Sequence, residues 1–288
     1  MNKVEEFGPL DPSSGVSPED YRKAVVFELS SPLGGNWKTE IVEVCGQVFV
    51  RAFPPLHRGP VSANYSDHGG KYSLSGYTGE IEEPTEGVKY LLDFISMALT
   101  RNDPDNLASD RDSKEGFPPA RLPKIPLKWF YKPRMLAKPP KFSKMKLGDV
   151  IDWQQRFFDT QKLPGGGYHS GLVSTGLGKY QFDRFHLPEL AQTSGTSMKA
   201  IFDEQLQDYF ALRLLAGADL YDYLNDQLEA QVFAYRLALH WPGLPLVSEG
   251  HTDGWGSKYE PGYSSVSGSV PMVGWKTFLL AVQNVKVR

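Results

Sequence analysis

The chain has 288 residues, a net charge of −3, an apolar fraction of 40% and a charged fraction of 23%. This length suits one large domain or two small ones with a sizeable core, and the composition is that of an ordinary soluble globular protein. A net charge so close to zero gives no general attraction to nucleic acid or to a membrane surface, so we expect neither as a partner.

The single cysteine, Cys45, excludes an internal disulfide. It lies in the strand-like run "EIVEVCGQVFVRAF", and we interpret it as a small buried apolar residue.

The first residues, "MNKVEEFGPLDPSSG", contain acids and prolines where a signal peptide needs a basic start and an apolar centre. No run approaches the length of about 18 to 20 apolar residues that a membrane-spanning helix needs. We therefore expect synthesis in a cytoplasm, no signal peptide and no membrane contact.

The first part of the chain has the pattern of β structure. Residues 1–18 are rich in Pro, Ser and Gly and predict an irregular arm. The runs "AVVFELS" and "TEIVEVCGQVFVRAF" favour strands, with the turn "PLGGN" between them, and "NYSDHGGKYSLSGYTGE" continues the pattern. We predict a small antiparallel β domain over residues 19–83, whose topology the sequence leaves open.

A helix is predicted next, over "EGVKYLLDFISMAL". Thr85 is a plausible N-cap, and Glu86 is favourable in the first turn. The apolar residues recur at helical spacing on one face, and the last of them continues the stripe as a core residue. They are Val88, Leu91, Leu92, Ile95 and Leu99.

Residues 116–148 differ from the rest because they are dense in proline and lysine and contain no acid. Proline at this density forbids regular helix and favours extended chain. Two interpretations stay open. The segment is a basic arm lying across an acidic or phosphate-bearing partner, with Trp129, Phe130 and Tyr131 for stacking, or an extended connection packed on its own domain.

The second half is predicted to be mainly helical. "KLGDVIDWQQRFFDTQ" gives an amphipathic helix followed by the glycine loop "LPGGGYHSG", and "GWKTFLLAVQNVKV" gives a short terminal helix. A long polar loop over 251–269 precedes that last helix. Two apolar stripes mark further helices, the second ending at Pro242 and Gly243. The first comprises Phe202, Leu206, Tyr209, Phe210 and Leu214, and the second Leu220, Leu224, Leu228, Val232, Tyr235 and Leu239.

Several site chemistries find no support in the sequence. The glycine segments "GGGYHSG" and "GLGK" lack the Gly-Lys-Ser/Thr ending and the strand–loop–helix context of phosphate loops. The six histidines are scattered and have no cysteine partners, so we expect no metal site. No Gly-x-Ser-x-Gly elbow is present, which leaves serine hydrolysis unsupported. We expect no cofactor.

A family resemblance accounts for more of the chain. "STGLGKYQF", residues 174–182, resembles the Gly-x-Tyr-Gln signature of phage lambda-type lysozymes and related muramidases. Four other segments resemble family segments and occur in the family's order, namely "LLDFISMA", "FSKMKLGDVIDWQ", "FDEQLQDYFALRLL" with its pair Gln207 and Asp208, and "FAYRLALHWPGLP". The resemblance implies a mainly helical lysozyme-like domain over 84–288, with the proline-rich basic insertion at about 104–146. The predicted fold is therefore α+β.

The family cleaves the bond between N-acetylmuramic acid and N-acetylglucosamine. A glutamate of raised pKa at the end of the first helix protonates the leaving oxygen. Placing Leu92 and Asp93 on the family's Leu-Asp pair puts this position at Leu99, and a leucine can neither donate nor accept a proton. Asp103, one helical turn further on, is the fallback acid.

The resemblance also implies that Leu99, Tyr180 and Gln181 lie together as candidates for a glycan cleft. A scaffold of this kind with leucine at the acid position predicts a pseudoenzyme. We therefore expect a structural protein of a bacteriophage virion, in the tail or baseplate, with other tail or baseplate proteins as partners and peptidoglycan as a glycan it can contact. The alternative is an active muramidase or lytic transglycosylase with a relocated acid such as Asp103.

Overall fold

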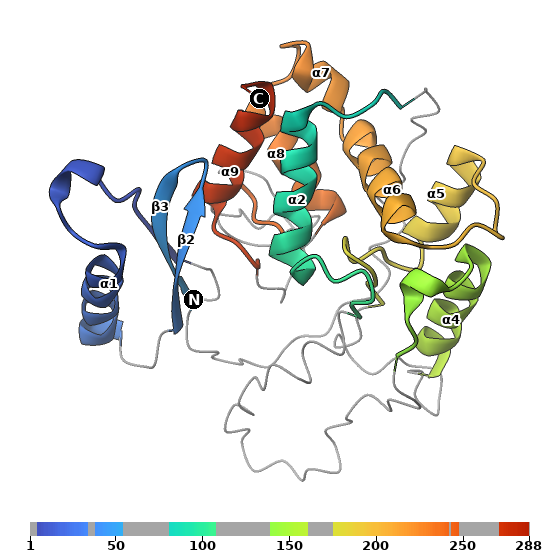
Figure 1. Ribbon diagram of the computed structural model, residues 1–288, viewed down its shortest axis with the longest axis horizontal. Helices are drawn as coiled ribbons and strands as arrows, with labels where there is room; N and C mark the ends of the chain where they lie inside the picture. Colours follow the sequence, from blue (N-terminus) through green and yellow to red (C-terminus); the bar gives the residue numbers. More distant parts are fainter. Residues whose placement is uncertain are drawn as a thin grey trace, which may run out of the picture. The chain divides into compact units, whose positions relative to one another are not determined.

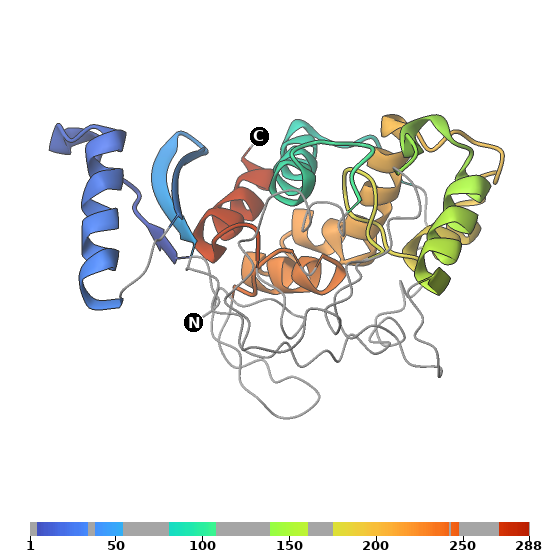
Figure 2. The same ribbon diagram turned by 90° about the horizontal axis from the view of Figure 1, so that it is seen from below.

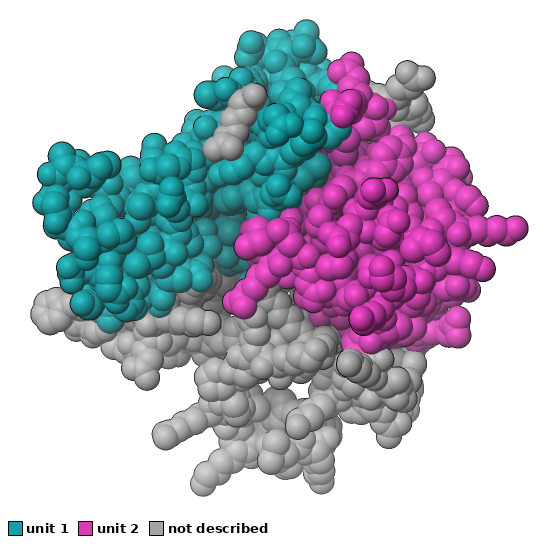
Figure 3. All heavy atoms as spheres, viewed as in Figure 1, with its two compact units in different colours: residues 1–57, 84–94, 219–288 teal, residues 58–83, 95–218 magenta. Residues whose placement is uncertain are grey.

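The computed structural model describes residues 5–33, 38–53, 81–107, 139–160, 175–241, 243–247 and 271–287. The chain divides into two compact units, coloured separately in Figure 3. Unit 1 contains residues 1–57, 84–94 and 219–288, and unit 2 contains residues 58–83 and 95–218. The predicted domain boundary between residues 83 and 84 is a statement about which parts of the chain fold independently. The division into compact units does not test it, so it stays a prediction.

Unit 1 contains a three-stranded antiparallel sheet in the order β1-β3-β2. The strands are β1 (Glu5–Phe7), β2 (Lys38–Val44) and β3 (Gln47–Phe53). β2 and β3 form a hairpin through a two-residue turn in which Cys45 and Gly46 have φ values of 54° and 74°. Positive φ at both positions is the conformation whose twist matches the two strands. The mixed α+β class and the antiparallel sheet near the N-terminus are confirmed.

The interpretation of Cys45 as a buried strand residue is wrong. The hairpin turn falls in the middle of the run that looked like one continuous strand, so Cys45 lies at its tip and is half-buried. Its Sγ lies 3.4 Å from the hydroxyl of Tyr90. The glycine that follows was the turn signal, because Gly46 takes the positive φ at no steric cost.

The predicted strand "AVVFELS" is also wrong, since it lies inside the helix α1 (Pro18–Leu33). A local start signal explains the helix: the Ser17 hydroxyl accepts from the Asp20 backbone N–H at 3.1 Å, and acids occupy the first turn. Val25 is buried with Val50 of β3, and α1 lies along one side of the hairpin while α9 (Trp275–Gln283) lies on the other (Figures 1 and 2). Tertiary packing of the apolar side therefore favours helix over the β-branched residues' preference for strand.

The predicted irregular arm contains β1 and a short 3-10 helix over Pro12–Ser14, so it is ordered in part. The Glu6 side chain, only 2% exposed, accepts from Arg51 Nε at 3.2 Å and from the Thr277 backbone N–H at 3.1 Å. Arg51 also donates to Glu40 at 3.0 Å. Glu6 therefore joins the first strand to the start of α9, where an N-terminal carboxylate is electrostatically favourable.

The helix predicted over 86–99 is confirmed. α2 is Glu86–Thr100, and the Thr85 hydroxyl accepts from the Val88 N–H at 3.3 Å as the predicted cap. The helix predicted over 146–161 is α4 (Leu147–Thr160), the first stripe apart from Phe202 lies in α6 (Glu204–Gly217), and the terminal helix is α9, followed by a 3-10 turn at Asn284–Lys286. The helix α5 (His186–Ser194) and the 3-10 turn at Phe142–Lys144 were not predicted. α2 contributes residues 86–94 to unit 1 and 95–100 to unit 2.

The second predicted stripe is not one helix. It is divided into α7 (Leu220–Leu224) and α8 (Ala230–His240), separated by a turn in which Asp226 has φ 59°. The two helices pack through Tyr223 and Phe233, whose rings stack 4.8 Å apart and which lie outside the predicted stripe. Of the predicted stripe only Leu220 is buried, and Val232 is exposed, so the spacing identified neither the break nor the buried face.

Some predictions fall outside the described residues. These are most of the turn "PLGGN", residues 64–80, most of the basic segment, the glycine loop at 163–171 and the polar loop over 251–269. Within the described ranges, no helix is both long and apolar enough to cross a membrane.

The Glu6 contacts predict a large loss of stability on substitution. Glu6→Ala leaves Arg51 buried with only Glu40 as a carboxylate partner, so we expect unfolding free energy to fall by about 3 kcal/mol, the lower end of what breaking a buried ion pair costs. Glu43→Ala, which removes an exposed glutamate from the same sheet, is the control and should change stability by less than about 0.5 kcal/mol. Urea unfolding of both variants tests this, and equal losses would contradict it.

Candidate functional site

Leu99 lies in the last turn of α2 and is 1% exposed. The other members of its apolar stripe are buried as well, so the side chain is part of the core. The helix ends at Thr100, whose hydroxyl donates to the Lys179 carbonyl at 2.8 Å. Arg101 and Asn102 follow with φ values of 59° and 62°, a left-handed conformation that non-glycine residues adopt at a cost. The chain is therefore turned sharply directly after the end of α2.

Residues 177–182, which contain Tyr180 and Gln181, form a tight turn that we call the Tyr-Gln turn. Leu177 and Phe182 exchange backbone hydrogen bonds of 3.0 and 2.9 Å, and the Gly178 N–H donates to the Asn106 carbonyl at 2.9 Å. Gln181 has φ 50°, and its side-chain amide donates to the Leu99 carbonyl at 3.1 Å. The Tyr-Gln turn is thus bonded directly to the end of α2.

Gln207 of α6 holds the Tyr-Gln turn in place through a hydrogen bond to its backbone. It is fully buried; its Oε1 accepts from the Lys179 N–H at 2.8 Å, and its Nε2 donates to the carbonyls of Phe202 and Pro104 at 3.0 and 3.2 Å. A Cβ on Gly178, whose φ is 75°, would lie 2.6 Å from the Gln207 oxygen. The glycine is required both for this close approach and for the left-handed conformation.

Asp208, the next residue of α6, holds the two side chains of the Tyr-Gln turn. Its Oδ1 accepts from the Tyr180 hydroxyl at 2.7 Å and from Lys179 Nζ at 2.8 Å. Lys179 Nζ also lies 3.8 Å from a Glu204 oxygen. Tyr180 is 1% exposed, so its hydroxyl is engaged within the protein. The sequence left open whether Tyr180 contacts a glycan or braces the turn, and this geometry favours bracing.

Gln154 of α4 is a structural residue that the sequence interpretation missed. It is fully buried, and its amide donates to the carbonyls of Thr175 and Phe182 at 2.6 and 2.8 Å. A signal for it existed, because Gln154 falls on the same helical face as the buried Leu147 and Phe157. A polar residue inside an apolar stripe predicts a buried hydrogen-bonding role.

The fallback acid Asp103 lies in the turn that follows α2, where its backbone N–H donates to the Thr100 carbonyl at 3.3 Å. Asp103 is exposed, and its Oδ1 accepts from the Asp105 backbone N–H at 2.9 Å, so it stabilises the turn after α2. The structure therefore joins Gln181 to Leu99 by a hydrogen bond, and it joins the hydroxyl of the adjacent Tyr180 to Asp208. It leaves Asp103 on the surface of the adjoining turn.

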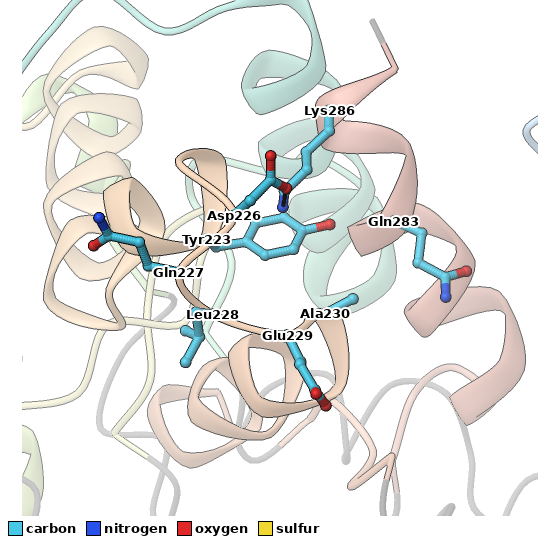
Figure 4. A pocket seen from close by; sticks show the side chains of 8 residues that line it. All are labelled: Tyr223, Asp226, Gln227, Leu228, Glu229, Ala230, Gln283 and Lys286. Atoms are coloured by element: carbon cyan, nitrogen blue, oxygen red, sulfur yellow. Dashed lines mark hydrogen bonds and ion pairs between the residues drawn. The ribbon is translucent and has the colours of Figure 1, made fainter.

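A separate open hollow of about 540 Å³ lies in unit 1 (Figure 4). Lys286 Nζ lies 2.5 Å from Asp226 and 4.3 Å from the Tyr223 ring centre. Burial, and secondarily the charge of Asp226, raises the pKa of the Tyr223 hydroxyl, which donates to the Val282 carbonyl at 2.9 Å. None of the predicted site residues line this hollow. Its lining is Tyr223, Asp226, Gln227, Leu228, Glu229, Ala230, Gln283 and Lys286.

Within the part of the chain that the structure describes, no group of three or more His, Cys, Asp or Glu side chains is arranged to hold a metal ion. Comparison with known proteins gave no match to a family model, to a curated protein or to a solved structure.

The close approach at Gly178 generates a paired prediction. Gly178→Ala forces Gln207 to move and leaves the Lys179 N–H without its acceptor, which costs about 1–3 kcal/mol in addition to the backbone strain. Gly195→Ala is the control, since Gly195 has φ 66° but open space around its Cβ position. It should lose only about 1 kcal/mol from the left-handed conformation. Chemical unfolding of both variants measures the difference, and equal losses would show that Gln207 is not constrained.

The raised pKa of Tyr223 predicts a pH dependence of stability. A group whose pKa is higher in the folded state stabilises the fold below its unfolded value, here about 10, and this contribution is lost as the pH rises through the folded value. Tyr223→Phe should lose about 0.5–1.5 kcal/mol at neutral pH with the Val282 hydrogen bond. It should then fall less steeply than the wild type above about pH 10. Thermal unfolding at a series of pH values tests this, and parallel curves would contradict it.

Proposed function

We propose that this chain is a structural protein of a bacteriophage tail or baseplate, and that it carries a lysozyme-like domain without a general acid. The observation on which the proposal rests is the contact between Leu99 and the Tyr-Gln turn. A buried leucine occupies the helix end where the resembled family has its glutamate, and Gln181 is bonded to that leucine's own carbonyl.

The contacts of unit 2 support the lysozyme-like interpretation. Three elements from segments that carry the resemblance meet at the Tyr-Gln turn, which lies in a fourth: the end of α2 contributes Leu99 and Thr100, α4 contributes Gln154, and α6 contributes Gln207. Segments far apart in the sequence and matched independently are thus joined by hydrogen bonds around one turn. Such an arrangement is expected if the motifs belong to a common scaffold.

The absence of an acid at position 99 supports a role other than lysis. A general acid contributes a factor of about 10² to 10⁴ to the rate, and in glycosidases burial keeps it protonated. Asp103 is exposed and bonded within its own turn, so it lacks that environment. A lysis enzyme cannot dispense with its acid. A tail or baseplate component can keep the domain as a folded module that contacts other virion proteins and cell-wall glycan.

The proposal predicts location. Mass spectrometry of purified phage particles should find the chain in stoichiometric amounts relative to known tail proteins, with a co-produced soluble phage protein as the control for contamination. Its absence from particles, with abundance in the lysate, would contradict a virion role.

A second test addresses activity. Wild-type protein should release no soluble fragments from purified peptidoglycan, and Asp103→Asn should not differ from it. Turnover by the wild type that disappears in Asp103→Asn would establish a relocated acid and an active muramidase. Leu99→Glu and Leu99→Gln form a matched pair, because both place a polar group in the core and only the first supplies an acid. Turnover in the glutamate variant alone would fix the register of the resemblance.

A further inference from the structure

The first turn of α4 is bonded to the chain that leads from α5 to α6 (Figure 1). The N–H groups of Leu147 and Gly148 donate to the carbonyls of Ala200 and Met198 at 2.8 and 3.0 Å. The first N–H groups of a helix have no acceptor within the helix, so these carbonyls replace a capping side chain. The cap uses only backbone atoms, and it therefore does not explain which side chains the capping segment carries.

Two large apolar side chains of that segment are exposed, Met198 by 49% and Ile201 by 44%. Ile201 forms an antiparallel bridge with Lys146, and the Phe202 N–H donates to the Met145 carbonyl at 2.9 Å, so the backbone beside them is fixed. Single exposed apolar side chains are ordinary on a protein surface. Among the large apolar side chains that the structure describes as exposed, however, no other two lie so close together in the sequence.

The stretches 141–148 and 197–201, which contain these residues and the start of α4, carry four lysines and no acid. All four lysines are exposed, and none is ion-paired with a residue that the structure describes. Lys146 lies opposite Ile201 in the bridge, which places the two side chains on the same face, and Lys199 lies two residues before Ile201. Together with Met198 and Ile201 they form what we call the Met-Lys surface, and they are Lys141, Lys144, Lys146 and Lys199.

Most of the carboxylates next to these stretches are engaged within the fold. Asp105 Oδ1 accepts from the Ser143 N–H at 2.7 Å. Asp203 caps α6, and Glu204 lies 3.8 Å from the ammonium group of the Tyr-Gln turn. Asp149 is exposed in the first turn of α4, where a negative charge is favourable. The four lysines outnumber the exposed acids, so the Met-Lys surface is positively charged although the whole chain has a net charge of −3.

The Met-Lys surface includes the described end of the proline-rich basic segment. Phe142 is fully buried, with its ring 4.9 Å from that of Trp153 in α4, and Leu147 is fully buried as well. This end therefore packs on unit 2, as expected from one of the two interpretations that the sequence left open. Its lysines are exposed beside the packed side chains, so the same chain also presents the cationic surface of the other interpretation.

We propose that the Met-Lys surface binds an acidic segment of a partner protein, one that carries apolar side chains among its carboxylates. The lysines attract the carboxylates, and Met198 and Ile201 provide apolar contact area on a backbone that does not have to be ordered on binding. Methionine is enriched in protein interfaces, since its flexible thioether adapts to different partner surfaces. The inference rests on the described contacts alone, and it depends neither on the lysozyme resemblance nor on the virion role.

Two other anionic partners fit these observations less well. A nucleic acid would use the lysines at its phosphates and leave Met198 and Ile201 without a role. Surfaces that bind an anionic bilayer insert tryptophan, phenylalanine or leucine side chains, and the Met-Lys surface contains none of these.

The experiment titrates the full-length chain into a fluorescently labelled amphipathic peptide of glutamate and leucine and follows the anisotropy. Binding should weaken as the ionic strength rises, because exposed charges are screened. Met198→Gln and Ile201→Thr keep the charges and should each weaken binding about five-fold or more, because apolar contact is lost. Lys199→Glu keeps the apolar contact and should also weaken binding about five-fold or more, because it repels the carboxylates.

Met97→Gln and Lys276→Glu are the matched controls, since Met97 is 53% exposed in α2 and Lys276 is exposed in α9. They make the same chemical changes outside the Met-Lys surface and should bind within about two-fold of the wild type, as expected for substitutions away from an interface. Circular dichroism should show all the variants folded.

The outcomes separate the parts of the proposal. Absence of binding by the wild type, or equal binding of a lysine–leucine peptide, overturns it. Unchanged binding by Met198→Gln or by Lys199→Glu overturns the site. Tighter binding of phosphatidylserine vesicles or of duplex DNA than of the peptide overturns the partner class. Self-association of the wild type in analytical ultracentrifugation, absent in Lys199→Glu, would make a second copy of this chain the occupant and overturn a separate partner.

Discussion

The carboxamide of Gln207 bonds to backbone groups from three separate segments of unit 2. Its oxygen accepts from the Tyr-Gln turn, and its nitrogen donates to the chain before α6 and to Pro104 after α2. A buried amide in this position costs free energy unless all its partners are present, so the three segments can be placed only together. Gly178 meets the same constraint, because a side chain there would occupy the space of the amide oxygen.

The residues that form this scaffold differ from Leu99, whose position is that of the acid only under the proposed function. Gln207, Gly178 and the Tyr180 hydroxyl are engaged within the protein, and the fold needs them whether or not a sugar is bound. A carboxyl at position 99 would do the opposite, because it would place a polar group in an apolar core. A buried leucine there contributes about 1.5–3 kcal/mol of favourable burial. The contacts of Gln207, Gly178 and Tyr180 and the burial of Leu99 are therefore all accounted for by folding.

In unit 1 a buried pair of charged side chains has the role that the neutral Gln207 amide has in unit 2. Glu6 and Arg51 form a buried ion pair, and Thr277 satisfies the remaining carboxylate positions through its N–H and hydroxyl. The pair joins the first strand to a helix about 270 residues later in the sequence. In unit 2 neutral amides fix the geometry, whereas in unit 1 a charged pair does so and relies on full hydrogen bonding to offset its desolvation.

The sequence by itself determined the elements whose signals are local. The Thr85 cap, the stripe ending at Leu99 and the amphipathic pattern of α4 identified helices near their observed bounds, because capping and apolar spacing act within a few residues. Tertiary structure decided whether "AVVFELS" is helix or strand, because that depends on what its apolar side packs against. It also decided that the polar residues Gln154 and Gln207 are buried. Each of them bonds to a partner 28 residues away in the sequence. Hydrogen bonds between distant segments leave no periodic trace in a sequence, and only folding shows which polar side chains make them.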